Sequence, residues 1–109
     1  MLFTCKEDFF EKTGKMVRLS REEEKRDAEL MYSGDLSARE RIVESYLVVT
    51  ASLVRRLSED MQTLDLIYRC VDAVEKAIDK FNFLQENEPF IHRLSILFRQ
   101  ITVKSIADK

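Results

Sequence analysis

Six large apolar residues recur between positions 64 and 81, and this stripe constrains the fold more than any other feature of the chain. Its members are Leu64, Ile67, Val71, Val74, Ile78 and Phe81. Apolar residues that alternate spacings of three and four lie on one side of an α-helix. We therefore predict a helix over residues 64–83 whose apolar side is buried. Its other side carries the charged residues Asp65, Arg69, Asp72, Glu75, Lys76 and Asp79.

Few residues interrupt helices elsewhere, since the 109 residues include only 2 Gly and 1 Pro. Ser20 followed by Glu23 has the spacing of a capping box, which predicts a helix over residues 21–32. The turn-forming residues 33–35 end it. A shorter helix is expected over residues 7–12, ended by Gly14. Its apolar anchors, which we expect to pack on the rest of the protein, are Phe3, Phe9 and Phe10.

Ser37 with Glu40 repeats the capping-box spacing and predicts a third helix, over residues 38–57. Its apolar residues cover so broad a face that we expect it at the centre of a bundle. Pro89 can occupy the first turn of a last helix. The apolar residues of that helix are Phe90, Leu94, Leu97, Ile101 and Ile106. No β-alternation competes with these patterns, so the predicted fold class is all-α, a compact bundle of four to five helices.

The chemistry needed by several classes of function is absent from the sequence. There is no glycine-rich phosphate loop, and the single histidine, His92, has no evident nucleophile partner, so we expect no enzyme. Cys5 and Cys70 are too far apart in sequence to form a metal-ligand motif, so no metal or other cofactor is expected. No apolar run reaches membrane-spanning length. We expect a reduced, cytoplasmic protein that does not bind membranes.

Several segments resemble, in order, the conserved motifs of one protein family. Residues 64–67 and 77–82 resemble L-D-L-I-Q-E-G-N-x-G-L-x-x-A-V-x-K-F-D. Residues 20–24 resemble T-R-E-E-E, and residues 34–44 resemble G-D-x-x-A-R-x-x-L-I-E. Farther along the chain, residues 98–101 resemble W-I-R-Q-A-I and residues 105–108 resemble A-I-A-D. With one extra residue before the last helix, the chain resembles region 2 of bacterial sigma-70-family RNA polymerase sigma factors.

This resemblance implies a region 2-like helical domain over residues 19–109, preceded by an N-terminal helical extension over residues 1–18. It also implies a role in transcription initiation. In the family, the L-D-L-I-Q-E-G helix docks on a coiled coil in the largest-subunit clamp of core RNA polymerase. The corresponding face here carries Asp65, Tyr68, Arg69, Asp72 and Glu75. The next family helix recognises the promoter −10 element. The corresponding positions here include Arg93, Arg99, Gln100 and Lys104.

The sequence departs from the family pattern at functional positions. In the docking motif, Q-E-G-N is replaced by residues 68–71, where Arg69 reverses a family charge. In the DNA-binding helix, the paired tryptophans become Ile96 and Leu97, and an aromatic residue becomes Arg93. The preceding loop, residues 84–88, carries Glu residues where the family is usually basic. We therefore expect the isolated domain to bind double-stranded promoter DNA weakly.

Two hypotheses follow from this sequence. The chain is a transcription-initiation module that binds core RNA polymerase and promoter −10 DNA. Alternatively, it is a diverged sigma-like regulatory domain that binds another protein and does not melt promoters. The family's −35-reading helix-turn-helix is not in this sequence. The chain is thus expected to be an excised domain or a fragment that works with a separate −35-reading partner. An anti-sigma factor is a further candidate partner.

Overall fold

The computed structural model describes residues 2–85 and 88–107 as a helical protein. Its elements are α1 (Lys6–Gly14), α2 (Arg21–Tyr32), α3 (Leu36–Arg55), a 3-10 turn η1 (Glu59–Met61), α4 (Leu64–Lys80) and α5 (Phe90–Ala107). No β-strand occurs within these two ranges. The predicted all-α bundle is therefore confirmed.

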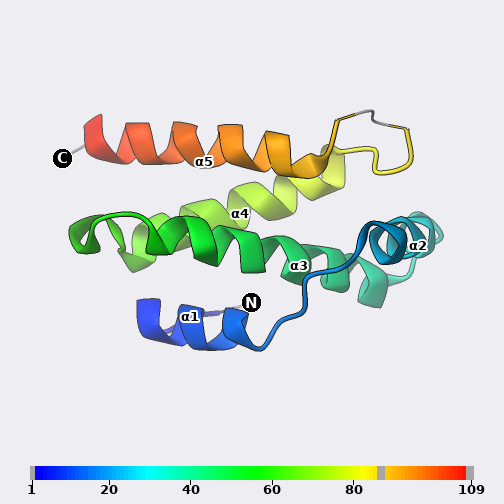
Figure 1. The fold of residues 1–109 in the computed structure, drawn as a ribbon, viewed down its shortest axis with the longest axis horizontal. Helices are drawn as coiled ribbons and strands as arrows, with labels where there is room; N and C mark the ends of the chain where they lie inside the picture. The colour runs from blue at the N-terminus through cyan, green and yellow to red at the C-terminus, as the bar shows by residue number, and fades with distance from the viewer. Residues whose placement is uncertain (1, 86–87, 108–109) are drawn as a thin grey trace.

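Helix α3 is the central element, as its broad apolar face predicts. It contacts α1, α2, α4 and α5, and α4 also packs against α5. Helices α1, α3 and α5 run roughly along the long axis of the molecule, whereas α2 is seen nearly end-on at one end (Figure 1). Within the part of the chain that the structure describes, no helix is long and apolar enough to cross a membrane.

The stripe predicted on α4 forms much of the core. Ile67 and Ile78 are fully buried, and Val71, Val74 and Phe81 are nearly so. They join a cluster with apolar residues of α3, among them Ile42 and Leu47. Leu64 is only half-buried, because it opens the helix at its exposed end. The opposite face of α4 carries charged residues at the surface, among them Asp65 and Asp72.

The ends of several helices differ from the sequence prediction. Helix α3 begins two residues early because the carboxylate of Asp35, not the predicted Ser37, caps it by accepting hydrogen bonds from the N–H groups of Ser37 and Ala38. It also ends at Arg55, before the predicted residue 57. By contrast, the Ser20–Glu23 capping box is confirmed, with both reciprocal hydrogen bonds present.

The later helices also end differently from the prediction. Helix α4 ends at Lys80 because Phe81 is already extended, three residues before the predicted end. Pro89 directly precedes α5 instead of lying in its first turn. The sequence did not predict η1, a 3-10 turn of three residues between α3 and α4.

A two-pronged ion pair fixes α3 against the C-terminal part of α4. The guanidinium of Arg39 donates from Nε to Asp79 Oδ1 at 2.8 Å and from Nη2 to Asp79 Oδ2 at 3.0 Å. The hydrogen bond from Arg39 lowers the pKa of Asp79 below its ordinary value. A second such pair joins α2 to α3, where Arg41 donates to both oxygens of the fully buried Asp27. Paired geometry of this kind orients the helices as well as joining them.

Candidate functional site

The exposed face of α4 carries all five residues that the family resemblance predicts for polymerase docking. Asp65, Arg69 and Asp72 are exposed, and Tyr68 and Glu75 are half-buried. At about 100° per residue, these positions lie within about one third of the helix circumference. The stripe of buried residues lies on the other side. We call these five residues the α4 face.

Ion pairs within α4 join several of these side chains to neighbours one turn away. Arg69 Nε lies 3.1 Å from Asp65 Oδ2, and Lys76 Nζ lies 2.9 Å from Asp72 Oδ2. Both pairs have the i,i+4 spacing at which helix side chains meet. Arg69, which stands where the family motif has Glu, therefore does more than reverse a charge. It also places a cation beside the acidic residue Asp65.

Tyr68 connects the α4 face to the N-terminal segment. The N–H of Phe3 donates to the Tyr68 hydroxyl at 2.7 Å, and this hydroxyl donates to the Phe3 carbonyl at 2.9 Å. The Phe3 ring is buried and packs edge-on against Phe9 of α1, with ring centroids 5.0 Å apart. Packing of Phe3, Phe9 and Phe10 on the rest of the protein is confirmed. The contact with Tyr68 was not foreseen, because no local pattern relates residues 65 positions apart.

Helix α5 carries the four candidate DNA-binding residues, all of them exposed. Arg93, Gln100 and Lys104 are seven and four residues apart, so they lie on one side of the helix, and Arg99 lies about 100° from Gln100. The guanidinium of Arg93 lies over the Phe81 ring, 5.4 Å from its centroid. Residues 90–107 include no Asp or Glu. The described part of α5 is therefore locally basic.

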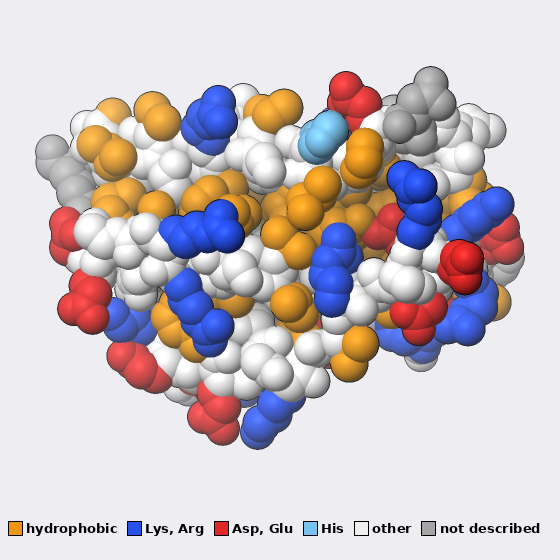
Figure 2. All heavy atoms as spheres, in the orientation of Figure 1, with side chains coloured by type: hydrophobic (Ala, Val, Ile, Leu, Met, Phe, Trp, Pro, Cys, Tyr) orange, Lys and Arg blue, Asp and Glu red, His pale blue; other side chains and the backbone are white. Residues whose placement is uncertain are grey.

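Exposed apolar side chains accompany these cations on α5. Ile96, Val103 and Ile106 have 58%, 60% and 62% of their surfaces exposed. Figure 2 shows hydrophobic side chains along α5 and between α5 and α3, with Lys and Arg side chains nearby. A surface that is both basic and apolar suits partners that offer both acidic and apolar groups.

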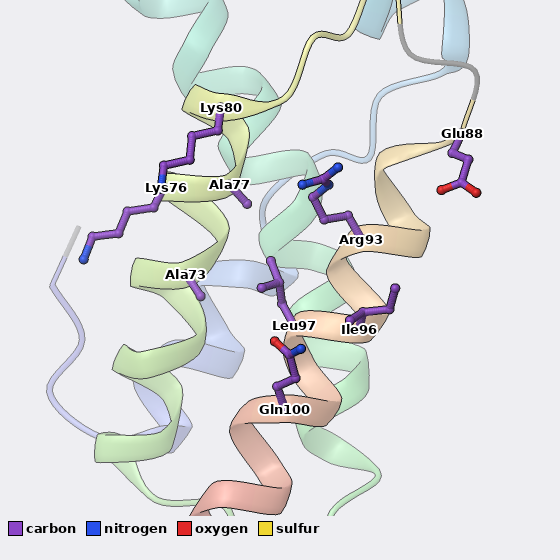
Figure 3. Close-up of a pocket in the computed structure, with 9 residues that line it drawn as sticks. All are labelled: Ala73, Lys76, Ala77, Lys80, Glu88, Arg93, Ile96, Leu97 and Gln100. Atoms are coloured by element: carbon purple, nitrogen blue, oxygen red, sulfur yellow. The ribbon is translucent and has the colours of Figure 1, made fainter.

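A groove of about 440 Å³ lies between α4 and α5. In Figure 3, Ala73 and Ala77 project from α4 toward α5, and Leu97 lies between the two helices. Arg93 reaches across the upper part of the groove, while Lys76 and Lys80 extend from the outer side of α4. The groove brings Arg93 and Gln100 together with these two lysines, a grouping that the sequence analysis did not foresee.

The cysteines and the histidine occupy separate, unremarkable environments. Cys5 is exposed and Cys70 is buried, and both are free thiols. Burial raises the pKa of the Cys70 thiol to about 12, so it is protonated at neutral pH. His92 is exposed on α5. Within residues 2–85 and 88–107, no group of three or more His, Cys, Asp or Glu residues has metal-binding geometry.

Comparison with known proteins identifies a relative. The chain is 32% identical over 102 residues to the RNA polymerase sigma factor SigA of Clostridium acetobutylicum. The chain is thus a distant relative of a segment of this sigma factor. No family model matches the chain, and no solved structure matches it.

The match covers 93% of this chain but only 27% of SigA. The chain therefore spans about a quarter of the length of the curated relative that it matches. The relative is itself an RNA polymerase sigma factor, which agrees with the family resemblance of the sequence motifs.

Proposed function

We propose that the chain is a sigma region 2-like module that binds core RNA polymerase through the α4 face and promoter −10 DNA through α5. The observation that carries this proposal is the arrangement of α4. Its family-like apolar stripe is buried, while Asp65 stands exposed on the opposite side with 77% of its side-chain surface accessible. A charged residue on a rigid helix, outside the core, is well placed to contact a partner.

The polymerase contact follows from the exposed charges of the α4 face. Asp65 matches an acidic position of the family docking motif, and Asp72 lies two turns farther along the same face. Neither residue contributes to the core, and each pairs with an exposed cation one turn away, so both carboxylates stay at the surface where a partner can reach them. A basic surface on the clamp coiled coil is the complementary partner that this face requires.

The DNA contact is expected to be weak for the isolated domain. Arg93, Arg99 and Lys104 supply only three cations on α5, and the exposed Glu88 precedes them. Because affinity for DNA rises with the number of phosphates neutralised, so few contacts give weak, salt-sensitive binding. The base-stacking tryptophans of the family are replaced by Ile96 and Leu97, which removes stacking energy as well.

The direct experiment is co-purification of the tagged domain with core RNA polymerase from its own bacterium. The proposal predicts a stoichiometric complex that excess untagged domain displaces. A second arm uses the isolated clamp coiled coil, which should also bind and should compete with the full core enzyme. Absence of a complex in both arms, with a domain shown to be folded by circular dichroism, would remove the polymerase function.

A second candidate function has its own support. The departures at Arg93, Ile96 and Leu97 all line the groove between α4 and α5, where family aromatic residues would otherwise stand. Loss of stacking groups there favours a diverged regulatory domain that binds another protein and does not melt promoters. The two functions separate in a promoter-opening assay with permanganate footprinting. The initiation module increases thymine reactivity near −10, whereas the regulator binds its protein partner without doing so.

A further inference from the structure

The groove between α4 and α5 has a floor of small and apolar side chains. Ala73 and Ala77 lie one turn apart on α4, and Leu97 faces them from α5. Two alanines at this spacing leave a channel along α4 that larger side chains would fill. Ile96, exposed over 58% of its surface, extends the apolar surface over the α5 rim. Such a channel between two helices matches the ridge of side chains on a third helix.

Basic residues from both helices line this groove. Lys76 and Lys80 belong to α4 and extend to its outer side, whereas Arg93 reaches over the groove from α5. Lys76 is partly neutralised by Asp72 at 2.9 Å, and Glu88 contributes one negative charge at the end of the groove. Three cations and one anion therefore line the groove directly. Its charge has the opposite sign to the net charge of −2 of the whole chain.

We propose that this groove is a docking site for an acidic amphipathic helix of a partner protein. Leucine-like side chains of that helix occupy the channel over Ala73, Ala77 and Leu97. Its Glu or Asp side chains meet the Lys76, Lys80 and Arg93 rims. Recognition of an amphipathic helix by a groove requires this combination of an apolar channel and complementary charge.

The lining favours a helix over a nucleic-acid strand. Single strands are held by aromatic platforms on which bases stack, and none of the described residues that line this groove is aromatic. Phosphate groups also gain nothing from an exposed isoleucine such as Ile96. A bound acidic helix would cover Arg93 and Gln100, which the proposed DNA contact also uses. Occupation of the groove would thus exclude DNA from this part of α5.

The inference is tested with a synthetic peptide and does not involve polymerase or promoter. The probe is a fluorescein-labelled 18-residue peptide, the length of α5, with Leu at spacings of three and four and Glu at most other positions. A peptide of the same composition in scrambled order is the control ligand. Fluorescence anisotropy measures binding of each to the full chain. We expect a dissociation constant on the order of 10 µM for the patterned peptide and at least about tenfold weaker binding of the scrambled one.

Matched surface variants locate the site. Ile96→Glu should weaken peptide binding about tenfold or more, whereas Val103→Glu should not, although both residues lie on α5 with nearly equal exposure. Lys80→Glu should weaken binding similarly, while Arg56→Glu, an exposed charge reversal at the end of α3, should leave it unchanged. All four positions are on the surface, so unfolding is avoided and is checked by circular dichroism.

Three results would overturn the inference. One is equal binding of the patterned and scrambled peptides, and another is equal loss in Ile96→Glu and Val103→Glu. The third is that a single-stranded oligonucleotide or a second copy of this chain occupies the groove more tightly than the patterned peptide does. Competition with unlabelled oligonucleotide and sedimentation of the protein alone detect these two occupants. Failure of peptide binding leaves the polymerase co-purification unaffected, so the two proposals fail separately.

Discussion

Asp65 and Arg69 form an ion pair on the exposed side of α4, with 3.1 Å between Asp65 Oδ2 and Arg69 Nε. Family docking motifs carry two acidic groups at these positions, and here one of them is replaced by a cation that pairs with the other. The pair is exposed, so its contribution to stability is small. In the proposed function, the pair matters through the charge that α4 presents to the polymerase.

Arg69→Glu tests whether this chain still binds a polymerase clamp that recognises the acidic docking motif of the family. The variant restores the acidic pair of the family, so binding to a polymerase with a standard clamp should strengthen. If the source bacterium's clamp has changed in compensation, the same variant should bind that polymerase more weakly. Titration of wild type and variant against both core enzymes measures the effect, expected to be about tenfold or 1.4 kcal/mol. Equal affinities in all four titrations would show that Arg69 does not contact the polymerase.

Ile67→Ala should destabilise the fold without affecting its surface. Ile67 is fully buried between α4 and α3, so truncation removes apolar contacts and leaves a cavity. The expected loss is about 2–5 kcal/mol in the free energy of unfolding. Urea denaturation followed by circular dichroism measures it. The control is Ile96→Ala, an exposed isoleucine whose truncation should change stability by less than about 0.5 kcal/mol.

Tyr68→Phe should release the N-terminal segment from α4. The variant removes the hydroxyl that accepts from the Phe3 N–H and donates to the Phe3 carbonyl, and we expect a loss of about 1–2 kcal/mol. Amide exchange at Phe3 should accelerate. Tyr32→Phe is the matched control, since its hydroxyl likewise bonds the Phe81 carbonyl and the Phe83 N–H. Unchanged exchange at Phe3 in Tyr68→Phe would mean that the segment is held by Phe3 packing alone.

Stability should fall as the solution becomes acidic, partly through Asp79. The hydrogen bond from Arg39 lowers the pKa of Asp79 from its ordinary value of 3.8, so the pair stabilises the fold above that value. This contribution is lost as pH falls through the lowered pKa of the folded state. Asp79→Asn should therefore be less sensitive to a change from pH 7 to pH 3. Glu23 and Asp8 have lowered pKa values too, so some acid sensitivity should remain in the variant. A variant that loses as much stability on acidification as wild type would contradict this role.

Much of the fold could be predicted because its signals are local. The stripe from Ile67 to Phe81 needs only the period of a helix, and Ser20 with Glu23 needs only a three-residue spacing. The start of α3 was missed because Asp35 and Ser37 are both good caps, and only the backbone at the turn decides between them. The end of α4 was missed because Phe81 continues the apolar spacing although its backbone is already extended.

The sequence predicted which residues of the candidate site share a helix face, but it did not predict which residues from different elements touch. Helical spacing places Asp65, Asp72 and Glu75 on one side of α4, and the structure agrees. The contact between Tyr68 and Phe3 depends on how α1 folds back along the bundle, which no local pattern encodes. The groove likewise depends on how closely α4 and α5 approach, so Lys76 and Lys80 gave no signal of their part in it.

Binding of core RNA polymerase to Asp65→Arg measures whether the α4 face is the polymerase contact. Glu11→Arg on α1 is the control, because Glu11 is similarly exposed and pairs with Lys15 at the same i,i+4 spacing. Both variants make the same charge change and break the same kind of pair. The account predicts that Asp65→Arg weakens binding about tenfold or more, while Glu11→Arg binds as wild type does. Equal affinities of the two variants for core polymerase, or no binding by folded wild type, would contradict it.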